Sequence, residues 1–298
     1  MPLPFISIIV PVYNGELFLS SCLDALLYQT YPKYEIIVVD NNSSDKTSQL
    51  LQKYRGNPKV KTTYEPLRSR GAARNKGIFL AKGKIIAMTD VDCIVDKNWL
   101  KSIANPIISR MAKIIIGGEV DKLNSFWTKQ QQEFNKKFVT ARRYDKYVHH
   151  LDTKNCAFDA SLIKKFKFDP HIANLEDFEL KIRLEQQKIR VYYLKECKVS
   201  HYHKNSFISL FVRRVNQGYW AAVIQRKHHT TEDPMFDAIS IEGITKFVPR
   251  VIFSFWKKGF RFFLFEAVTG TAWRIGIIGS WIHIMMHTIA KVFHMAIG

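Results

Sequence analysis

Apolar and polar segments alternate regularly along the first third of the chain. Short apolar runs rich in β-branched residues, typical of strands buried on both faces, recur at residues 5–10, 34–39, 60–64 and 84–89. Helical segments are expected between them, at residues 16–29, at 46–54 and in a stretch that ends at 81. Strands and helices in this order predict an α/β fold with a mostly parallel sheet and right-handed crossovers.

The predicted strands end on polar clusters. Asp40 closes the second strand, and Asp90-Val91-Asp92 follows the fourth. Ligands bind at the carboxyl edge of open α/β sheets, so we expect these acids to converge there. Asp90 and Asp92, spaced i and i+2, point to the same side of an extended chain. Their carboxylates suit Mg²⁺ or Mn²⁺ and the phosphates that such ions carry, although an acidic turn has the same pattern.

The second third has a weaker pattern. We expect a strand at residues 113–118, a polar helix at 125–146 and a strand at 191–194. A further helix begins near Leu175 and carries Glu176 and Asp177 in its first turn, where acids also serve the helix dipole. His201 and His203 form a His-x-His pair, which either binds a metal or lies on the surface.

Composition narrows the class of protein. The 298 residues are 47% hydrophobic and 24% charged, as in folded proteins, with a net charge of +19. So basic a chain implies a polyanionic partner: nucleic acid, an anionic membrane or a phosphorylated substrate. The four cysteines are far apart in the sequence, so we expect them to be reduced thiols. The N-terminal apolar run ends at Pro11, so we expect a strand there and no signal peptide. No G-x-G-x-x-G or P-loop pattern occurs.

The C-terminal segment differs in composition. Residues 207–228 form an amphipathic pattern, and 231–234 mark a boundary. Residues 247–298 are aromatic and basic, and their longest uncharged run, 275–290 with histidine counted as neutral, is shorter than the roughly 20 residues of a spanning helix. This composition predicts a helical extension lying in a membrane interface. A helical hairpin packed on the main domain and a true span are the alternatives.

An ordered set of short motifs resembles family 2 glycosyltransferases of the GT-A fold. Over about residues 5–220 the matches are Val10-Pro11-Val12-Tyr13-Asn14, Glu35 to Asp40, Ser44-Asp45, Gly71 to Gly77, Asp90-Val91-Asp92, Gly117-Gly118, Phe168-Asp169, Glu176 to Leu180, and Val199-Ser200-His201. The resemblance implies a GT-A domain at 1–233, with a nucleotide-sugar half at 1–110 and an acceptor half at 111–233. Residues 234–298 are the extension.

The resemblance also implies roles for individual residues. Donor-binding residues would be Pro11, Tyr13, Asn14, Glu16, Asp40, Arg74 and Asp90. Within this set, Asp40 would accept a hydrogen bond from uracil, Arg74 would approach the base or pyrophosphate, and Asp90 would hold the ribose. Asp92 and His201 would bind Mn²⁺ or Mg²⁺, with His203 as the reserve ligand. A UDP-sugar is therefore the favoured donor.

Inverting transfer needs a base for the acceptor hydroxyl. Asp177 matches the family's base, and Glu176 would orient it. Relatives often have glycine where this chain has Leu175, and Asp-Gly where it has Asn41-Asn42.

The expected reaction is transfer of one sugar, because Gln217-Gly218-Tyr219-Trp220 lacks the arginine and the spacing of the processive Q-x-x-R-W motif. The acceptor would be a lipid-linked or cell-surface glycan precursor, and Arg213 and Arg214 either grip its phosphate or are solvated. We expect a cytoplasmic enzyme on the inner face of the membrane that binds no nucleic acid. The alternatives are a nucleotidyltransferase and a non-enzymatic basic protein that binds anionic lipid or nucleic acid.

Overall fold

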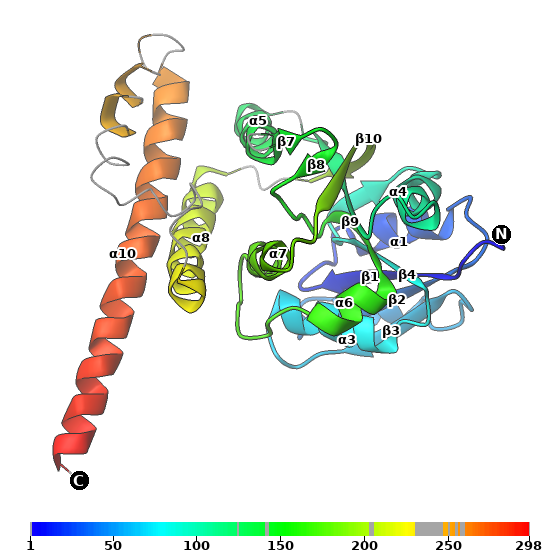
Figure 1. Ribbon diagram of the computed structural model, residues 1–298, viewed down its shortest axis with the longest axis horizontal. Coiled ribbons are helices and arrows are strands. Elements are labelled where there is room, and N and C mark those ends of the chain that lie inside the picture. The colour runs from blue at the N-terminus through cyan, green and yellow to red at the C-terminus, as the bar shows by residue number, and fades with distance from the viewer. Residues whose placement is uncertain are drawn as a thin grey trace. The chain divides into compact units, whose positions relative to one another are not determined.

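Figure 1 shows the computed structural model of the chain. The structure describes residues 2–123, 125–140, 143–202, 206–229 and 247–297, except for 250, 254–255 and 257–259. The chain forms two compact units, Met1–His203 and Lys204–Gly298. The predicted domain boundary after residue 233 and the reserve metal ligand His203 lie outside the described residues.

The first unit contains one sheet with the strand order β3-β2-β1-β4-β9-β6-β10-β8-β7, and β5 pairs with β10. Its first four strands are parallel: β1 (Ile6–Val12), β2 (Tyr34–Asp40), β3 (Val60–Tyr64) and β4 (Ile85–Thr89). Val12 lies beside Asp40 in this register. The loops after β1, β2 and β4 therefore leave the sheet on the same edge, as the sequence predicts.

Beyond β4 the sheet is mixed. Strand β9 (Asn155–Asp159) runs antiparallel between β4 and β6 (Ile114–Asp121), and β6 is parallel to β10 (Val191–His201). Three short strands add antiparallel pairs: β5 (Cys93–Val95), β7 (Arg143–Tyr144) and β8 (Tyr147–Val148). The predicted α/β class is confirmed, and the parallel arrangement belongs to the first four strands and to the β6–β10 pair.

Helices cover both faces of this sheet (Figure 1). One face packs against α1 (Leu19–Leu27), α2 (Thr47–Gln52) and α4 (Trp99–Ile108), and the other against α3 (Arg70–Leu80), α6 (Ala160–Phe166) and α7 (Glu176–Gln186). Helix α5 (Phe126–Thr140) contacts β6. Within β1, Ile8 and Val10 face the first group while Ile9 faces the second. The β-branched runs are thus buried on both faces, which explains their continuous apolar pattern.

Strand β10 is longer than the sequence suggests, because it passes through a bulge. Leu194 pairs with Gly117 of β6, and Lys198 pairs with the next residue, Gly118, so residues 195–197 are additional. The side-chain amide of Asn155 donates to the carbonyls of Gly118 and Cys197, at 2.7 and 2.8 Å. A Cβ on Gly117 would lie 2.1 Å from the Cys197 carbonyl oxygen. Glycine is therefore required there, and the bulge determines where the end of β10 lies.

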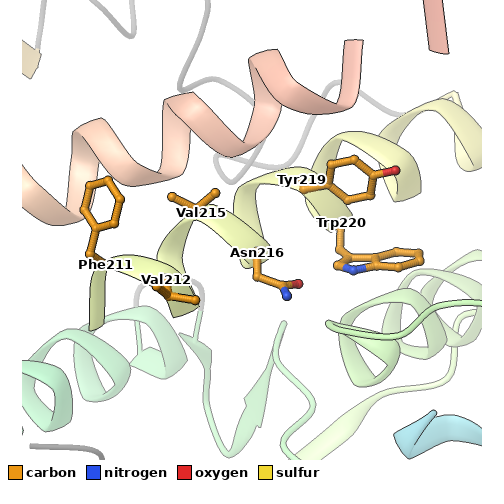
Figure 2. Close-up of a pocket in the computed structure, with 6 residues that line it drawn as sticks. All are labelled: Phe211, Val212, Val215, Asn216, Tyr219 and Trp220. Atoms are coloured by element: carbon orange, nitrogen blue, oxygen red, sulfur yellow. The ribbon is translucent and has the colours of Figure 1, made fainter. Parts of the chain in front are cut away.

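The second unit pairs α8 (Phe207–His228) with α10 (Phe260–Ile297). A Cβ on Gly218 would lie 2.0 Å from the Trp273 carbonyl oxygen, and one on Gly276 would lie 1.9 Å from that of Val215. Close approach at glycines is a common way for helices to pair in membranes. Along α8, Figure 2 shows a mainly apolar hollow lined by Phe211, Val212, Val215, Asn216, Tyr219 and Trp220.

Among the described residues, Phe260–His283 is the one helical stretch long and apolar enough to cross a membrane. Several of its large apolar side chains are about half exposed, including Ile278, Trp281 and Ile282 at 53%, 50% and 51%. The predicted C-terminal helical extension is therefore present. Whether it lies in the interface or spans the membrane stays a prediction.

Candidate active site

The loops after β1 and β2 are joined by reciprocal hydrogen bonds. The backbone N–H of Asn14 donates to Ser43 Oγ at 3.0 Å, while Asn14 Oδ1 accepts from the N–H of Ser44 at 2.8 Å. Glu16 repeats the arrangement: its N–H donates to Asp45 and its carboxylate accepts from the N–H of Lys46. Asn14 has a φ of 49°, a left-handed conformation that asparagine tolerates. Both residues therefore shape this part of the sheet edge.

Asp40 lies at the base of these loops and is 4% exposed. One of its oxygens accepts from the N–H of Ser43 at 3.0 Å, and the other accepts from the hydroxyl of Ser48. These bonds fix the orientation of the carboxylate. Each oxygen keeps a second lone pair for a ligand.

Tyr13 forms an aromatic platform at the same edge. The residue is 41% exposed, and the guanidinium of Arg68 lies 4.2 Å from the ring centroid and donates to the Tyr13 hydroxyl. Pro11 lies in β1, two residues before Tyr13, and pairs with Val39 of β2. A flat, half-exposed ring backed by a cation can stack with a planar base.

Arg74 connects the D-x-D pair to the acids of α7. Its Nη2 lies 2.9 Å from Asp90 Oδ1, and its Nη1 contacts Glu176 Oε1. The Arg74 side chain is 2% exposed. Burial lowers the pKa of Arg74, but Glu176 and Asp90 more than compensate and hold it above its usual range. The sequence suggested contact with the base or pyrophosphate, whereas here both terminal nitrogens contact protein carboxylates.

Asp177 follows Glu176 in the first turn of α7 and is half-buried. Burial, with the nearby charges of Glu176 and Asp152, raises the pKa of Asp177 to about 6. Leu175, just before α7, has a φ of 62°. The left-handed turn that glycine forms readily is thus built here with leucine, at a cost of about 1–2 kcal/mol.

Asp92 is paired with His201. His201 Nε2 lies 3.4 Å from Asp92 Oδ2, and Nδ1 lies 3.3 Å from Glu119 Oε2. Burial lowers the pKa of His201, but its hydrogen bonds with Asp92 and Glu119 outweigh this and raise it to about 9. The two predicted metal ligands therefore come together, although 109 positions separate them in the sequence.

The donor atoms at this position suit a divalent cation. Asp92, Cys93 and His201 present ligand atoms within 4.8 Å of one another. Carboxylate and imidazole are usual ligands of Mn²⁺, and phosphate oxygens of a nucleotide can complete the shell. The thiol of Cys93 is buried, and burial with the charges of Asp92 and Asp90 raises its pKa well above the ordinary value. Asp92 and His201 thus fit the cation, and Cys93 stays a protonated neighbour.

Similarity to known sequences decides the family of this chain. Residues 7–168, more than half of the chain, match the glycosyl transferase family 2 domain. This chain belongs to glycosyl transferase family 2. The family assignment replaces the nucleotidyltransferase and non-enzymatic alternatives.

Curated relatives of this family 2 glycosyltransferase share parts of its sequence. Glycosyltransferase AglE of Haloferax volcanii is 37% identical over 129 residues, 40% of this chain and 40% of AglE. The poly(ribitol-phosphate) beta-glucosyltransferase of Bacillus spizizenii is 32% identical over 195 residues, 62% of this chain and 30% of that protein. The chain thus spans less than half of these relatives' length.

Solved structures show the same fold at low sequence identity. The mannosyltransferase PcManGT from Pyrobaculum calidifontis, in complex with GDP-Man and Mn²⁺, superposes with a TM-score of 0.64 at 16% identity, covering 92% of this chain and 87% of its own. S. aureus TarS 1-349 in complex with UDP-GlcNAc gives 0.57 at 19%, covering 85% and 76%. The predicted GT-A fold is confirmed.

The glycosyltransferase also contains site residues that the sequence did not single out. Glu119 and Lys154 stand behind His201, Asn155 holds the β10 bulge, and Arg68 backs Tyr13. In the sequence, only the preceding Gly117-Gly118 motif could have pointed to Glu119. Lys154 and Asn155 lie in a stretch without periodicity, so only the fold shows their positions.

Proposed function

We propose that this glycosyltransferase moves one sugar from a nucleotide-diphosphate sugar, a UDP-sugar by preference, to an acceptor hydroxyl with inversion. The observation that carries the proposal is the Arg74 bridge, which joins Asp90 to Glu176 and so brings the acid pair of α7 to the D-x-D edge. A donor at this edge would have the candidate base, Asp177, beside it. Its raised pKa suits proton transfer near neutral pH.

Each side chain then has a defined task. Asp177 accepts the proton of the acceptor hydroxyl as it attacks C1 of the sugar, and Glu176, fixed by Arg74, orients the loop that carries it. Asp90 holds the ribose. Asp92 and His201 hold Mn²⁺ or Mg²⁺, an ion that offsets charge on a departing diphosphate.

The remaining donor residues would bind the nucleoside. Tyr13 stacks with the base between Pro11 and Asn14, Glu16 closes the uridine side, and Asp40 accepts from the uracil imide N–H. The solved relatives bind UDP-GlcNAc in one case and GDP-Man in another. The preference for UDP therefore rests mainly on Asp40 and is modest.

The proposed acceptor is a lipid-linked or cell-surface glycan precursor. A Methanococcus voltae relative, 26% identical over 254 residues, is named for transfer to a dolichyl-linked sugar phosphate. The exposed apolar side chains of α10 and the basic residues of the C-terminal segment support attachment to the cytoplasmic face of an anionic membrane. Arg213, in α8, is a candidate for an acceptor phosphate, whereas the neighbouring Arg214 is buried and its Nη1 donates to Gln217 Oε1 at 3.1 Å.

Replacing the base tests the proposed mechanism. Asp177→Asn keeps the size of the side chain but removes the proton acceptor, and we expect transfer to slow by about 10³-fold. Donor binding, followed by calorimetry with UDP and Mn²⁺, should stay near the wild-type value. The matched control is Glu196→Gln, an exposed acid in the β10 bulge. Transfer that survives in Asp177→Asn excludes Asp177 as the base.

Metal and nucleotide dependence test the donor. Release of UDP or GDP from the matching sugar nucleotides should require Mn²⁺ or Mg²⁺ and stop with EDTA, and UDP-sugars should react faster. Metal-independent release would exclude the cation.

Flotation tests the proposed membrane attachment. Phosphatidylglycerol vesicles should recover the full chain, and neutral vesicles or 1 M salt should recover less. Equal recovery on both vesicle types would exclude an anionic surface.

A further inference from the structure

The imidazole of His201 lies between two carboxylates, one from the turn after β4 and one from β6. Asp92 follows β4 and faces Nε2, while Glu119 of β6 faces Nδ1. An imidazole can bind a cation through one nitrogen while the other donates its hydrogen. Because Asp92 belongs to the D-x-D pair, Nε2 is the nitrogen on the cation side, and Nδ1 is left for Glu119.

The pairing of β6 with β10 places Glu119 next to this ring. Glu119 is the register partner of Val199, two residues before His201. Residues two apart on a strand point to the same face, so Glu119 and His201 project on one side of the sheet. The β10 bulge, held by Asn155, establishes this register.

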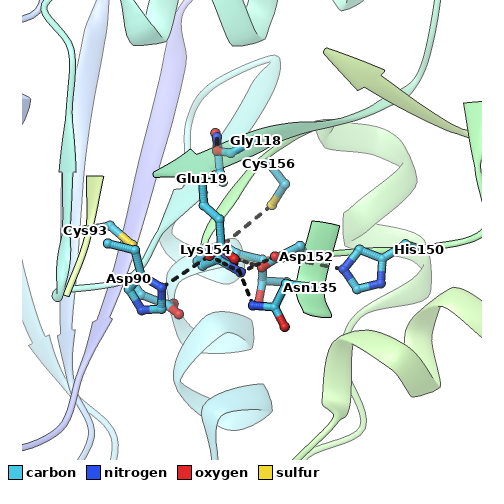
Figure 3. A network of polar contacts seen from close by, with 12 residues as sticks. Asp90, Cys93, Gly118, Glu119, Asn135, His150, Asp152, Lys154 and Cys156 are labelled. Carbon is cyan, nitrogen blue, oxygen red and sulfur yellow. Dashed lines mark hydrogen bonds and ion pairs between the residues drawn. The ribbon is translucent and has the colours of Figure 1, made fainter. Parts of the chain in front are cut away.

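Glu119 is itself held at both of its oxygens. Asn135 of α5 donates to Oε1 at 2.8 Å, and the Nζ of Lys154 lies 3.1 Å from Oε2. Lys154 also contacts Asp152, which keeps the ammonium in place. Figure 3 shows Lys154 at the centre of this network, with Glu119, Asp152 and Asn135 around it. The Glu119 side chain is only 10% exposed, so its carboxylate has little freedom to turn.

We propose that Glu119, clamped by Lys154 and Asn135, is the positioning residue of the metal-binding histidine. It accepts the hydrogen of Nδ1 and so directs the Nε2 lone pair of His201 toward Asp92 and the cation. The inference rests on the metal site proposed above. Partners of this kind fix the tautomer and the ring orientation of a metal ligand, and their loss typically weakens metal binding by about 10- to 100-fold.

Electron paramagnetic resonance of bound Mn²⁺ can test the positioning role of Glu119 without measuring turnover. Titration of the full-length protein with Mn²⁺ in the presence of UDP gives the affinity. Electron spin-echo modulation from a ¹⁴N nucleus reports a coordinated imidazole. The wild-type protein should show both tight binding and the nitrogen modulation, and His201→Gln should lose the modulation.

Two substitutions at Glu119 separate orientation from charge. Glu119→Leu removes the acceptor. We expect it to weaken Mn²⁺ binding by about 10- to 100-fold and to abolish the ¹⁴N modulation. Glu119→Gln keeps an oxygen that accepts from Nδ1–H, so it should keep the modulation and most of the affinity. Glu133→Gln, an exposed acid on α5 whose side chain is 55% exposed, is the matched control and should bind like the wild type.

Asn135→Ala provides a test that leaves Glu119 in place. Removing the amide frees one oxygen of the carboxylate, and we expect Mn²⁺ affinity to fall about threefold, the usual scale for one hydrogen bond. This variant serves if Glu119→Leu does not fold, as judged by circular dichroism.

The outcomes distinguish the two proposals. If the wild-type protein shows no ¹⁴N modulation, the proposed metal site is wrong. If the wild type shows it and Glu119→Leu keeps both affinity and modulation, the metal site stands and the role of Glu119 is overturned. Equal losses in Glu119→Gln and Glu119→Leu also overturn the positioning role, since charge alone would then account for the effect.

Discussion

Asp90 and Asp92 leave the same strand two residues apart, yet they have opposite kinds of partner. Asp90 is paired with the guanidinium of Arg74, which stays charged at every accessible pH. Asp92 is paired with the imidazole of His201, which can release its proton. One carboxylate therefore has a permanent internal counter-ion, and the other has a partner that can bind a cation with it.

The two networks also differ in what they connect. The Asp90 network runs through Arg74 to Glu176 and joins two distant parts of the chain. The Asp92 network runs through His201 and Glu119 to Lys154. The first therefore ties the D-x-D edge to α7, and the second is suited to a cation. This distinction predicts different results when each network is broken.

Removing Arg74 should have the largest effect on stability. Arg74→Met leaves Glu176 buried and unpaired, and breaking a buried ion pair costs about 3–5 kcal/mol. Urea unfolding followed by circular dichroism measures the change. The control is Arg55→Met, which removes an exposed guanidinium and should change stability by less than about 0.5 kcal/mol. Equal stability of the two variants would contradict a structural role for the Arg74 bridge.

Removing His201 should affect metal binding more than stability. His201→Gln leaves Glu119 paired with Lys154, and the Asp92 side chain is 35% exposed, so we expect a smaller loss of stability than in Arg74→Met. Mn²⁺ affinity should fall by about 100-fold, since even outer partners of a metal ligand contribute 10- to 100-fold. Calorimetric titration with Mn²⁺ and UDP measures this. The exposed His171→Gln is the control, and unchanged affinity in His201→Gln would rule out His201 as a ligand.

The pH profile tests the raised pKa of Asp177. A base must be deprotonated, so kcat/KM should be constant above about pH 7, reach half its plateau near pH 6 and fall about tenfold per unit well below that. The free energy of unfolding changes with pH in the opposite direction. Because the folded pKa exceeds the ordinary 3.8, this group destabilises the fold as pH rises from 4 to 6, by about 2 kcal/mol. Asp177→Asn should remove that destabilisation, as unfolding at several pH values will show; a profile flat down to pH 4 would contradict the assignment.

The smallest effect is expected at the nucleotide platform, outside both networks. Arg68→Ala removes the cation that backs Tyr13, a contact that contributes about 0.5–1 kcal/mol at an exposed site. The KM for the donor should rise two- to fivefold, with kcat unchanged. Steady-state kinetics with Arg55→Ala as the control measure this, and a fall in kcat alone would argue against a donor-binding role.

The sequence predicts the strand ends of this site well and its long-range pairs poorly. Asp40 and the D-x-D pair follow apolar runs whose parallel arrangement can be inferred from the alternation of strands and helices. The convergence of Arg74 with Glu176 cannot be inferred in this way, because it depends on how α7 packs against the sheet. Resemblance to the family supplied Asp177 and His201, but not the conformation of Leu175.

Local pattern also failed where a strand departs from regular pairing. Lys195 and Glu196 are charged and interrupt the apolar run, so the sequence predicted that the strand ends before them. The structure continues through them because the glycine pair and Asn155 accommodate a bulge. Such an arrangement depends on three separate segments at once, which periodicity in one of them cannot reveal.

The same bulge has an evolutionary consequence. It divides β10 into two ladders, one paired with β8 and the first half of β6, the other with β5 and the residues around Glu119. A change in length at the exposed Lys195 or Glu196 is absorbed between the two ladders. Selection can therefore lengthen or shorten this surface loop while His201 keeps its place beside the D-x-D pair.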